Sequence, residues 1–150
     1  MSAEDAGPTE VRAGAVRLLA RREHSRRELA RKLAERGHDS AVVEAVLDDL
    51  AAEGLLDEAR FAEVYARMRV ERGYGPLAIR AQLRERGIGD ELIEAALAGW
   101  SDADWFEQLR AVARRRFGAA LPTDNRERAR RMRALAARGF PESLVRRLFR

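Results

Sequence analysis

The chain has 150 residues, of which 46% are hydrophobic and 36% are charged. This balance excludes a disordered chain, and no apolar run approaches the roughly 18 residues that would span a bilayer. Cysteine is absent, which excludes disulfides, thiolate nucleophiles and every Cys-based zinc site. The first eight residues lack the basic start and apolar core of a secretory signal, so we expect a soluble, cytoplasmic protein.

The positive charge is concentrated toward one end of the chain. There are 29 lysines and arginines against 25 aspartates and glutamates, which gives a net charge of +4. Residues 101–150 alone hold 13 arginines against six acidic residues. A basic surface of this kind favours a polyanionic or acidic partner. The alternative is a codon bias toward arginine, which explains the scarcity of lysine but not the uneven distribution of charge.

Apolar residues recur at helical spacing throughout the chain, beginning with Val11, Ala15, Leu18 and Leu19. No segment alternates with the period of two that a strand shows, and strong helix formers fill most positions. The sequence therefore predicts an all-α fold behind a disordered tail at residues 1–9. The predicted helices cover residues 10–23, 26–36, 41–53, 58–72, 76–86, 90–99, 102–117, 125–138 and 142–149.

Capping residues mark the ends of these helices. Ser25 and Glu28 have the spacing of a capping box, in which each side chain accepts a hydrogen bond from a backbone N–H at the helix start. Gly37, Gly87 and Gly139 each follow an arginine at a predicted helix end, where glycine adopts the left-handed conformation at the lowest cost.

A threefold internal repeat organises the chain. Aligning the three glycines also brings Leu33, Leu83 and Leu135 together, at separations of 50 and 52 residues. Each repeat holds three predicted helices, which divides the chain into residues 10–56, 57–100 and 101–150. Because one such unit is too small to bury its own apolar faces, we expect the units to stack into an elongated, curved, solenoid-like array, whose hand stays open.

The sequence lacks a catalytic or metal-binding constellation. The two histidines, His24 and His38, lie in different predicted turns and outside any metal-ligand pattern, so we expect both to be solvated. Asp48 and Asp49 are adjacent on a predicted helix and point in different directions, so they cannot share a proton or a metal. We therefore expect neither enzymatic activity nor a cofactor.

Arginines are the strongest candidates for binding a partner. Arg126, Arg130 and Arg133 share one face of the eighth predicted helix, with little acidic compensation, which favours contact with a polyanion. The full set of candidate partner or DNA contacts is Arg26, Arg27, Arg31, Lys32, Arg80, Arg84, Arg114, Arg115, Arg126, Arg130 and Arg133.

Other roles remain open for part of this set. Arg114 and Arg115 close a predicted helix, where cations also complement the helix dipole. The basic residues of the first unit are balanced by glutamates, so an ordinary charged surface explains them equally well. Trp100 and Trp105 flank the boundary between the second and third units, where core packing is the favoured role and base stacking the alternative.

Several motifs resemble those of a known family. The stretch from Leu18 to Leu33, LLARREHSRRELARKL, resembles the first-unit signature of the RecX regulatory proteins. The second-unit pattern of that family is similar to residues 57–62, to residues 72–76 and to the Gly87-Ile88 pair with its preceding helix. The resemblance covers about residues 10–149. Ala78 departs from it, because the family often has an arginine there.

The resemblance implies a modulator of the RecA recombinase. RecX proteins bind RecA filaments on single-stranded DNA, lie in the filament groove and limit filament growth or promote disassembly. They thereby restrain ATP hydrolysis, strand exchange and the co-protease activity that triggers the SOS response, without catalysis of their own. The resemblance thus implies a monomer whose partners are the RecA filament and, weakly and without sequence preference, single-stranded DNA.

Two other functions compete with this interpretation. Residues 46–56 resemble part of a winged helix-turn-helix domain, which predicts a DNA-binding transcriptional regulator that reads duplex sites. A scaffold that contacts no nucleic acid is the remaining alternative.

Overall fold

The computed structural model describes residues 7–150, and this part of the chain is helical with no strand. Its helices are α1 (Pro8–Arg21), α2 (Arg26–Glu35), α3 (Ser40–Ala52), α4 (Glu58–Glu71), α5 (Pro76–Glu85), α6 (Asp90–Leu97), α7 (Asp102–Phe117), α8 (Asn125–Ala137) and α9 (Glu142–Leu148). Every predicted helix is present, with ends shifted by at most two residues. The predicted tail at residues 1–9 lies outside the described residues up to residue 6, and α1 already begins at Pro8.

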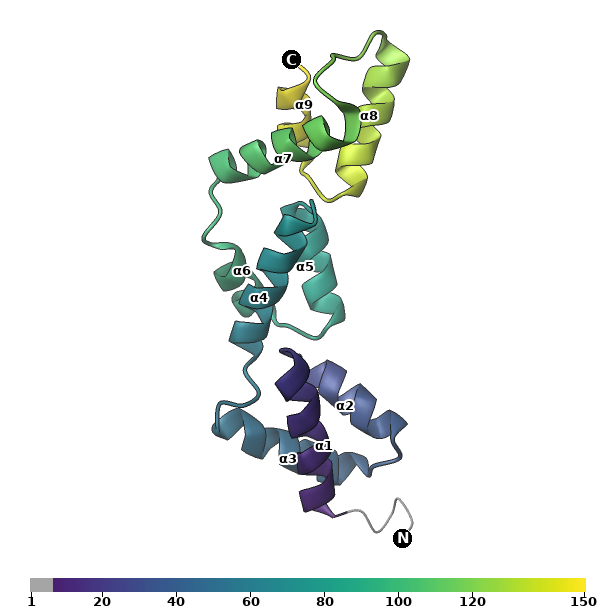
Figure 1. Cartoon of the computed structure of the whole chain (residues 1–150). Helices are drawn as coiled ribbons and strands as arrows, with labels where there is room; N and C mark the ends of the chain where they lie inside the picture. The colour runs from purple at the N-terminus through teal and green to yellow at the C-terminus, as the bar shows by residue number, and fades with distance from the viewer. Residues whose placement is uncertain (1–6) are drawn as a thin grey trace.

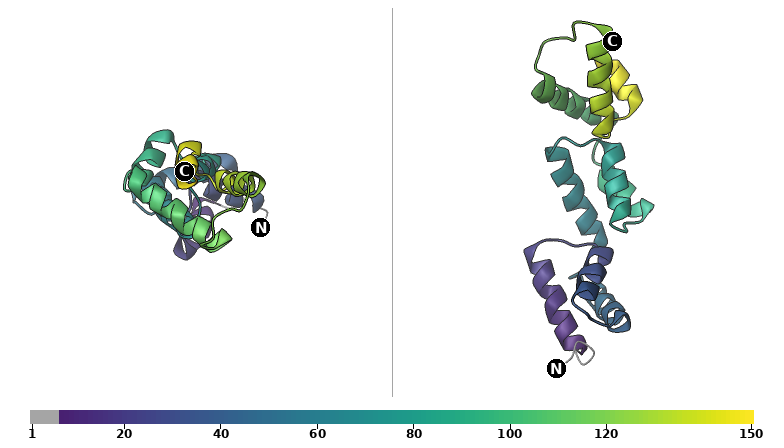
Figure 2. Two further views of the ribbon diagram at one scale, coloured as in Figure 1. Left: turned by 90° about the horizontal axis from the view of Figure 1, so that it is seen from above. Right: turned by 90° about the vertical axis from the view of Figure 1, so that its right-hand side faces the viewer.

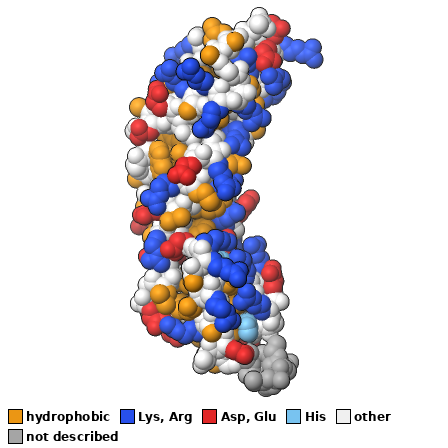
Figure 3. Space-filling view, viewed as in Figure 1, with side chains coloured by type: hydrophobic (Ala, Val, Ile, Leu, Met, Phe, Trp, Pro, Cys, Tyr) orange, Lys and Arg blue, Asp and Glu red, His pale blue; other side chains and the backbone are white. Residues whose placement is uncertain are grey.

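The helices form three units of three, which we call unit 1 (α1–α3), unit 2 (α4–α6) and unit 3 (α7–α9). The units stack end to end into a narrow column (Figures 1 and 2). The outline of the column is bowed, and α2, α5 and α8 follow its inner side (Figures 1 and 3). The elongated, curved array of three-helix repeats that the sequence predicts is therefore confirmed.

The predicted caps are present. The Ser25 hydroxyl accepts a hydrogen bond from the Glu28 N–H at 3.1 Å, and the Glu28 carboxylate accepts one from the Ser25 N–H at 3.0 Å. The three turn glycines have positive φ angles of 86°, 83° and 99°, in the order Gly37, Gly87 and Gly139. Because a side chain is strained in this conformation, glycine fixes where the second helix of each unit ends.

The buried residues form two separate clusters. One lies within unit 1 and includes Leu33 and Leu47, both fully buried. The other runs through units 2 and 3 and includes Leu83 and Leu135. The expectation that no unit can bury its own apolar faces is thus wrong for unit 1, because the crossing of α1 and α2 over α3 encloses a small core of its own.

The junction between units 2 and 3 is tight and is bonded through the backbone. The Gly75 N–H donates to the Arg138 carbonyl at 2.8 Å, and the Leu77 N–H donates to the Gly139 carbonyl at 2.9 Å. The Arg138 side chain adds hydrogen bonds to the carbonyls of residues 72 and 73, and its guanidinium lies 4.1 Å from the ring centre of Tyr74. Units 2 and 3 therefore share a hydrophobic core and are also joined by two backbone hydrogen bonds.

Two tryptophans pack into this shared core. Trp105 is 5% exposed, and Trp100 packs beside it with the ring centres 5.5 Å apart. The core role that we favour from the sequence is therefore confirmed, and Trp105 leaves no face free for base stacking.

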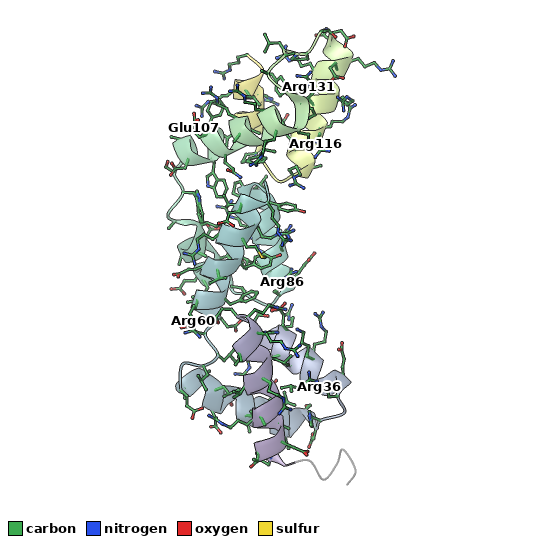
Figure 4. The ribbon with its side chains drawn as sticks, viewed as in Figure 1. Arg36, Arg60, Arg86, Glu107, Arg116 and Arg131 are labelled. Atoms are coloured by element: carbon green, nitrogen blue, oxygen red, sulfur yellow. The ribbon has the colours of Figure 1, made fainter. Side chains whose placement is uncertain are left out.

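The junction between units 1 and 2 is polar. Arg60 and Arg86 of unit 2 both lie beside it (Figure 4), and Arg60 pairs with Glu23 of unit 1 at 2.5 Å. The Arg86 guanidinium lies 3.9 Å from the buried carboxylate of Glu28. Burial alone would raise the pKa of Glu28, but hydrogen bonds from Arg22 and the Ser25 N–H outweigh burial and lower it. A charged glutamate therefore sits at this junction at neutral pH.

Candidate partner-binding surface

Nine of the eleven candidate residues lie on the second helices of the units, α2, α5 and α8. These helices follow one side of the array, while α1, α4 and α7 follow the other (Figure 2). Figure 3 shows basic side chains along the inner side from α8 down to α2. The stacking thus brings together residues that are up to about 100 positions apart in the sequence.

Four of the candidates are held by carboxylates. In each case a guanidinium nitrogen lies 2.6–3.0 Å from a carboxylate oxygen. The opposite charges of each pair cancel at long range, so these arginines attract a distant polyanion only weakly. The pairs are Arg26 with Glu44 and Asp48, Arg80 with Glu94, Arg84 with Asp90, and Arg130 with Glu127.

The face of α8 is less basic than its sequence predicts. Glu127 accepts hydrogen bonds from Arg130 at 2.6 Å and from Arg131 at 3.0 Å. These bonds lower the pKa of Glu127 to about 2, so this carboxylate is charged at any ordinary pH. The expectation of little acidic compensation is therefore wrong for Arg130, while Arg126 and Arg133 have no ion pair among the described residues.

Two further candidates have partners within the chain: Arg27 reaches across the first junction, and Lys32 contacts a histidine of its own unit. The Arg27 guanidinium donates to the Glu85 carbonyl of unit 2 at 3.3 Å. The Lys32 ammonium lies 2.9 Å from the Nε2 atom of His24, and burial lowers the pKa of Lys32.

The same contact corrects the expectation that His24 is solvated. Its side chain is enclosed beneath Lys32, the residue is 1% exposed, and Nδ1 lies 3.0 Å from the Arg22 carbonyl. Burial lowers the pKa of His24, which favours a neutral ring that donates through Nδ1–H and accepts from Lys32 through Nε2. His38 is half-buried, and its Nδ1 is buried with no hydrogen-bond partner within the described chain.

The remaining five candidates are exposed and carry no salt bridge within residues 7–150. They are Arg31 on α2, Arg114 and Arg115 near the end of α7, and Arg126 and Arg133 on α8. Four of the five belong to unit 3, so these unpaired candidates gather toward the C-terminal end of the array.

Residues 7–150 contain no group of three or more His, Asp or Glu side chains placed to hold a metal ion. No helix among them is both long and apolar enough to cross a membrane.

Sequence reasoning missed the arginines that join the units. Arg86 and Arg138 occupy equivalent repeat positions, and each guanidinium reaches the preceding unit. The aligned arginines next to Gly87 and Gly139 were the available signal, but an alignment cannot tell an arginine that binds a partner from one that bridges two units.

Comparison with protein families identifies the array. The models described as the first, second and third three-helix domains of RecX match residues 12–50, 57–97 and 102–149, respectively. The chain belongs to the RecX family. The family resemblance of the sequence motifs is thereby confirmed, and it extends to unit 3, whose match covers α7 to α9.

Relatives of this RecX-family chain match it over nearly its whole length. The regulatory protein RecX of Halorhodospira halophila is 55% identical over 146 residues, which are 97% of this chain and 90% of the relative. That of Ectopseudomonas mendocina is 48% identical over 143 residues, 95% of both chains.

Solved RecX structures have the same fold. A crystal structure of regulatory protein RecX, 25% identical in sequence, superimposes with a TM-score of 0.77 over 91% of this chain and 71% of that one. RecX from Lactobacillus salivarius, 20% identical, superimposes with a TM-score of 0.78 over 92% of this chain and 91% of that one. Both relatives carry the name regulatory protein RecX.

Proposed function

We propose that this protein binds RecA filaments on single-stranded DNA and inhibits the ATPase, recombinase and co-protease activities of RecA. It does so as a cytoplasmic monomer that occupies the filament groove, without catalysis and without a cofactor. Its partners are the RecA filament and, weakly and without sequence preference, the single strand.

The observation that carries this proposal is the alignment of the second helices along the inner side of a bowed column. A row of similar units presents similar groups at regular intervals, which suits a partner that is itself a helical repeat. Several weak contacts made at once then act together through their high effective concentration.

The five uncompensated arginines supply the chemistry. A guanidinium forms paired hydrogen bonds with a phosphate or a carboxylate, so these residues can contact either the DNA backbone or acidic side chains of RecA. Those on α8, Arg126 and Arg133, are the strongest candidates for phosphate, because they are exposed and carry no salt bridge within the described residues.

The direct test mixes the protein with RecA, ATP and single-stranded DNA. We expect the ATPase rate to fall and the filaments to shorten as the protein is added. An unchanged rate and unchanged filament length at saturating protein would contradict the proposal.

A salt titration tests the arginines themselves. Five phosphate contacts on a single strand predict a slope of about −3.5 for log K against log salt concentration. The double variant Arg126→Ala, Arg133→Ala removes two of these contacts, so the slope should change to about −2. The matched control is Arg17→Ala, Arg67→Ala, because these arginines are exposed and lie on α1 and α4, not on a second helix.

The same titration separates the alternatives. A slope near zero would indicate a scaffold that does not bind nucleic acid. A preference of about 10³-fold or more for particular duplex sites would instead indicate a transcriptional regulator.

A further inference from the structure

The two junctions of the array follow one docking rule. In each, the turn after the second helix of one unit packs against the start of the second helix of the preceding unit. At the second junction this turn is Arg138-Gly139, which meets Gly75 and Leu77 at the start of α5. At the first junction it is the turn at Gly87, which packs against the side chain of Arg27 on α2. The start of a second helix is therefore the receiving surface of each unit.

Unit 3 has the same receiving position, but no fourth unit follows it among the described residues. The loop between α7 and α8, residues 118–124, and the start of α8 lie at the free end of the array (Figure 1). A cavity of about 600 Å³ opens there, between this loop, the last turns of α7 and the end of the chain. Its volume lies within the range of ordinary ligand pockets, about 300–1,000 Å³. We call it the end pocket.

The walls of the end pocket combine positive charge with apolar surface. Asp124 is the only carboxylate side chain among the residues that line it, and its Oδ1 already accepts a hydrogen bond from the Glu127 N–H at 2.8 Å. Leu121, at 83% exposed, presents apolar surface in the loop. The arginines lining the pocket are Arg110, Arg114, Arg128, Arg131 and Arg150.

A hydrogen bond from α8 anchors the loop at the edge of the pocket. The Arg131 side chain is 13% exposed, and its Nη1 donates to the Ala120 carbonyl at 2.8 Å while Glu127 anchors its Nε at 3.0 Å. Arg131 lies at the upper end of the array (Figure 4). Arg114 and Arg128 carry no salt bridge within the described residues, so their guanidinium groups are available to a ligand.

The charge of the pocket excludes the obvious occupant. A second copy of this chain would have to insert its own free turn, which in unit 1 is Arg36-Gly37-His38. A basic turn entering a pocket lined by arginines is repelled, which disfavours a second copy of this chain as the occupant. Nucleic acid would satisfy the guanidinium groups but would leave Leu121 and the neighbouring apolar walls without a partner.

We propose that the end pocket binds an acidic peptide segment of a partner protein, with carboxylates on Arg114 and Arg128 and an apolar side chain against Leu121. The segment takes the place that the turn of a following unit takes at the two internal junctions. This inference goes beyond the proposed function, because it requires neither DNA nor a filament.

The test measures binding of a fluorescein-labelled eight-residue peptide, made of aspartate and glutamate around a central Leu-Gly pair, by fluorescence anisotropy with the full chain. Arg114→Gln should weaken binding roughly tenfold, because a hydrogen bond to a charged group is lost. The matched control is Arg116→Gln, two residues away on α7 with the same change in charge but outside the pocket lining, which should change binding less than about twofold.

Three further comparisons decide the proposal. The same peptide with Asn and Gln in place of its acids should not bind measurably, and Leu121→Asn, at a position too exposed to affect folding, should weaken binding a few-fold. Equal binding to the Arg114→Gln and Arg116→Gln variants would overturn the proposal. So would displacement of the peptide by an eight-residue thymidine oligonucleotide at a lower concentration than by unlabelled peptide, since the pocket would then be a nucleic-acid site.

Discussion

Substituting Gly139 by alanine should separate unit 3 from unit 2. Gly139 has a φ angle of +99°, and a Cβ atom there would lie 2.4 Å from the Cβ of Ala78 and 2.5 Å from its backbone nitrogen. The new methyl group cannot be accommodated by rotating a flexible side chain, because the atoms that it meets belong to the start of α5. The turn must therefore move away from unit 2.

The expected loss of stability has two parts. A side chain in the left-handed region costs about 1–2 kcal/mol. Moving the turn also breaks the two backbone hydrogen bonds that link residues 75 and 77 to the turn, each of which contributes about 0.5–1.5 kcal/mol. We therefore expect Gly139→Ala to lower the free energy of unfolding by about 2–5 kcal/mol.

Gly54 provides the matched control. It also has a positive φ angle, +77°, but nothing lies within 4 Å of a Cβ added there. Gly54→Ala should therefore cost the conformational strain alone, about 1–2 kcal/mol. Urea denaturation followed by circular dichroism measures both variants, and equal losses would refute the argument that this turn holds the two units together.

Three further outcomes are expected. Leu33→Ala and Leu83→Ala should each lower the free energy of unfolding by about 2–5 kcal/mol, because each leaves a cavity. Calorimetry should show the first loss in the unfolding of unit 1 and the second in the unfolding of units 2 and 3. A single transition shared by both variants would contradict the separate cores. Because the pKa of His24 in the folded protein is lowered by burial, its contribution to stability is complete above the unfolded value near 6.5 and is lost as the pH falls through the folded pKa. The melting temperature should consequently fall between pH 7.5 and pH 5.5 by more than in His24→Gln, and identical pH profiles would exclude this origin. Glu28→Gln should destabilise by about 1–3 kcal/mol, since it leaves Arg22 without its buried partner; a change within error would mean that the cap tolerates the amide.

The sequence determined the local structure almost completely. Helical periodicity, the Ser25–Glu28 capping box and the glycines after each second helix are short-range signals, and every predicted helix is present. The threefold repeat and the family motifs are also patterns of neighbouring residues. They could therefore be recognised in the sequence before the fold was known.

The candidate surface was predictable only as a set of residues. The sequence indicates which helices carry basic residues, but ion pairing depends on neighbours that are distant in the chain. Arg26 is neutralised by residues of α3, and Arg80 by a residue of α6, and neither pairing leaves a signal in the local pattern.

Short-range patterning of apolar residues and caps thus fixed the helices, their order and their grouping in threes. The tertiary structure alone decided how the units join: a polar junction between units 1 and 2, with His24 buried beside it, and a shared core between units 2 and 3. The physical reason is that a helix end depends on a few neighbouring residues. Desolvation and charge neutralisation instead depend on which surfaces the folded chain brings together.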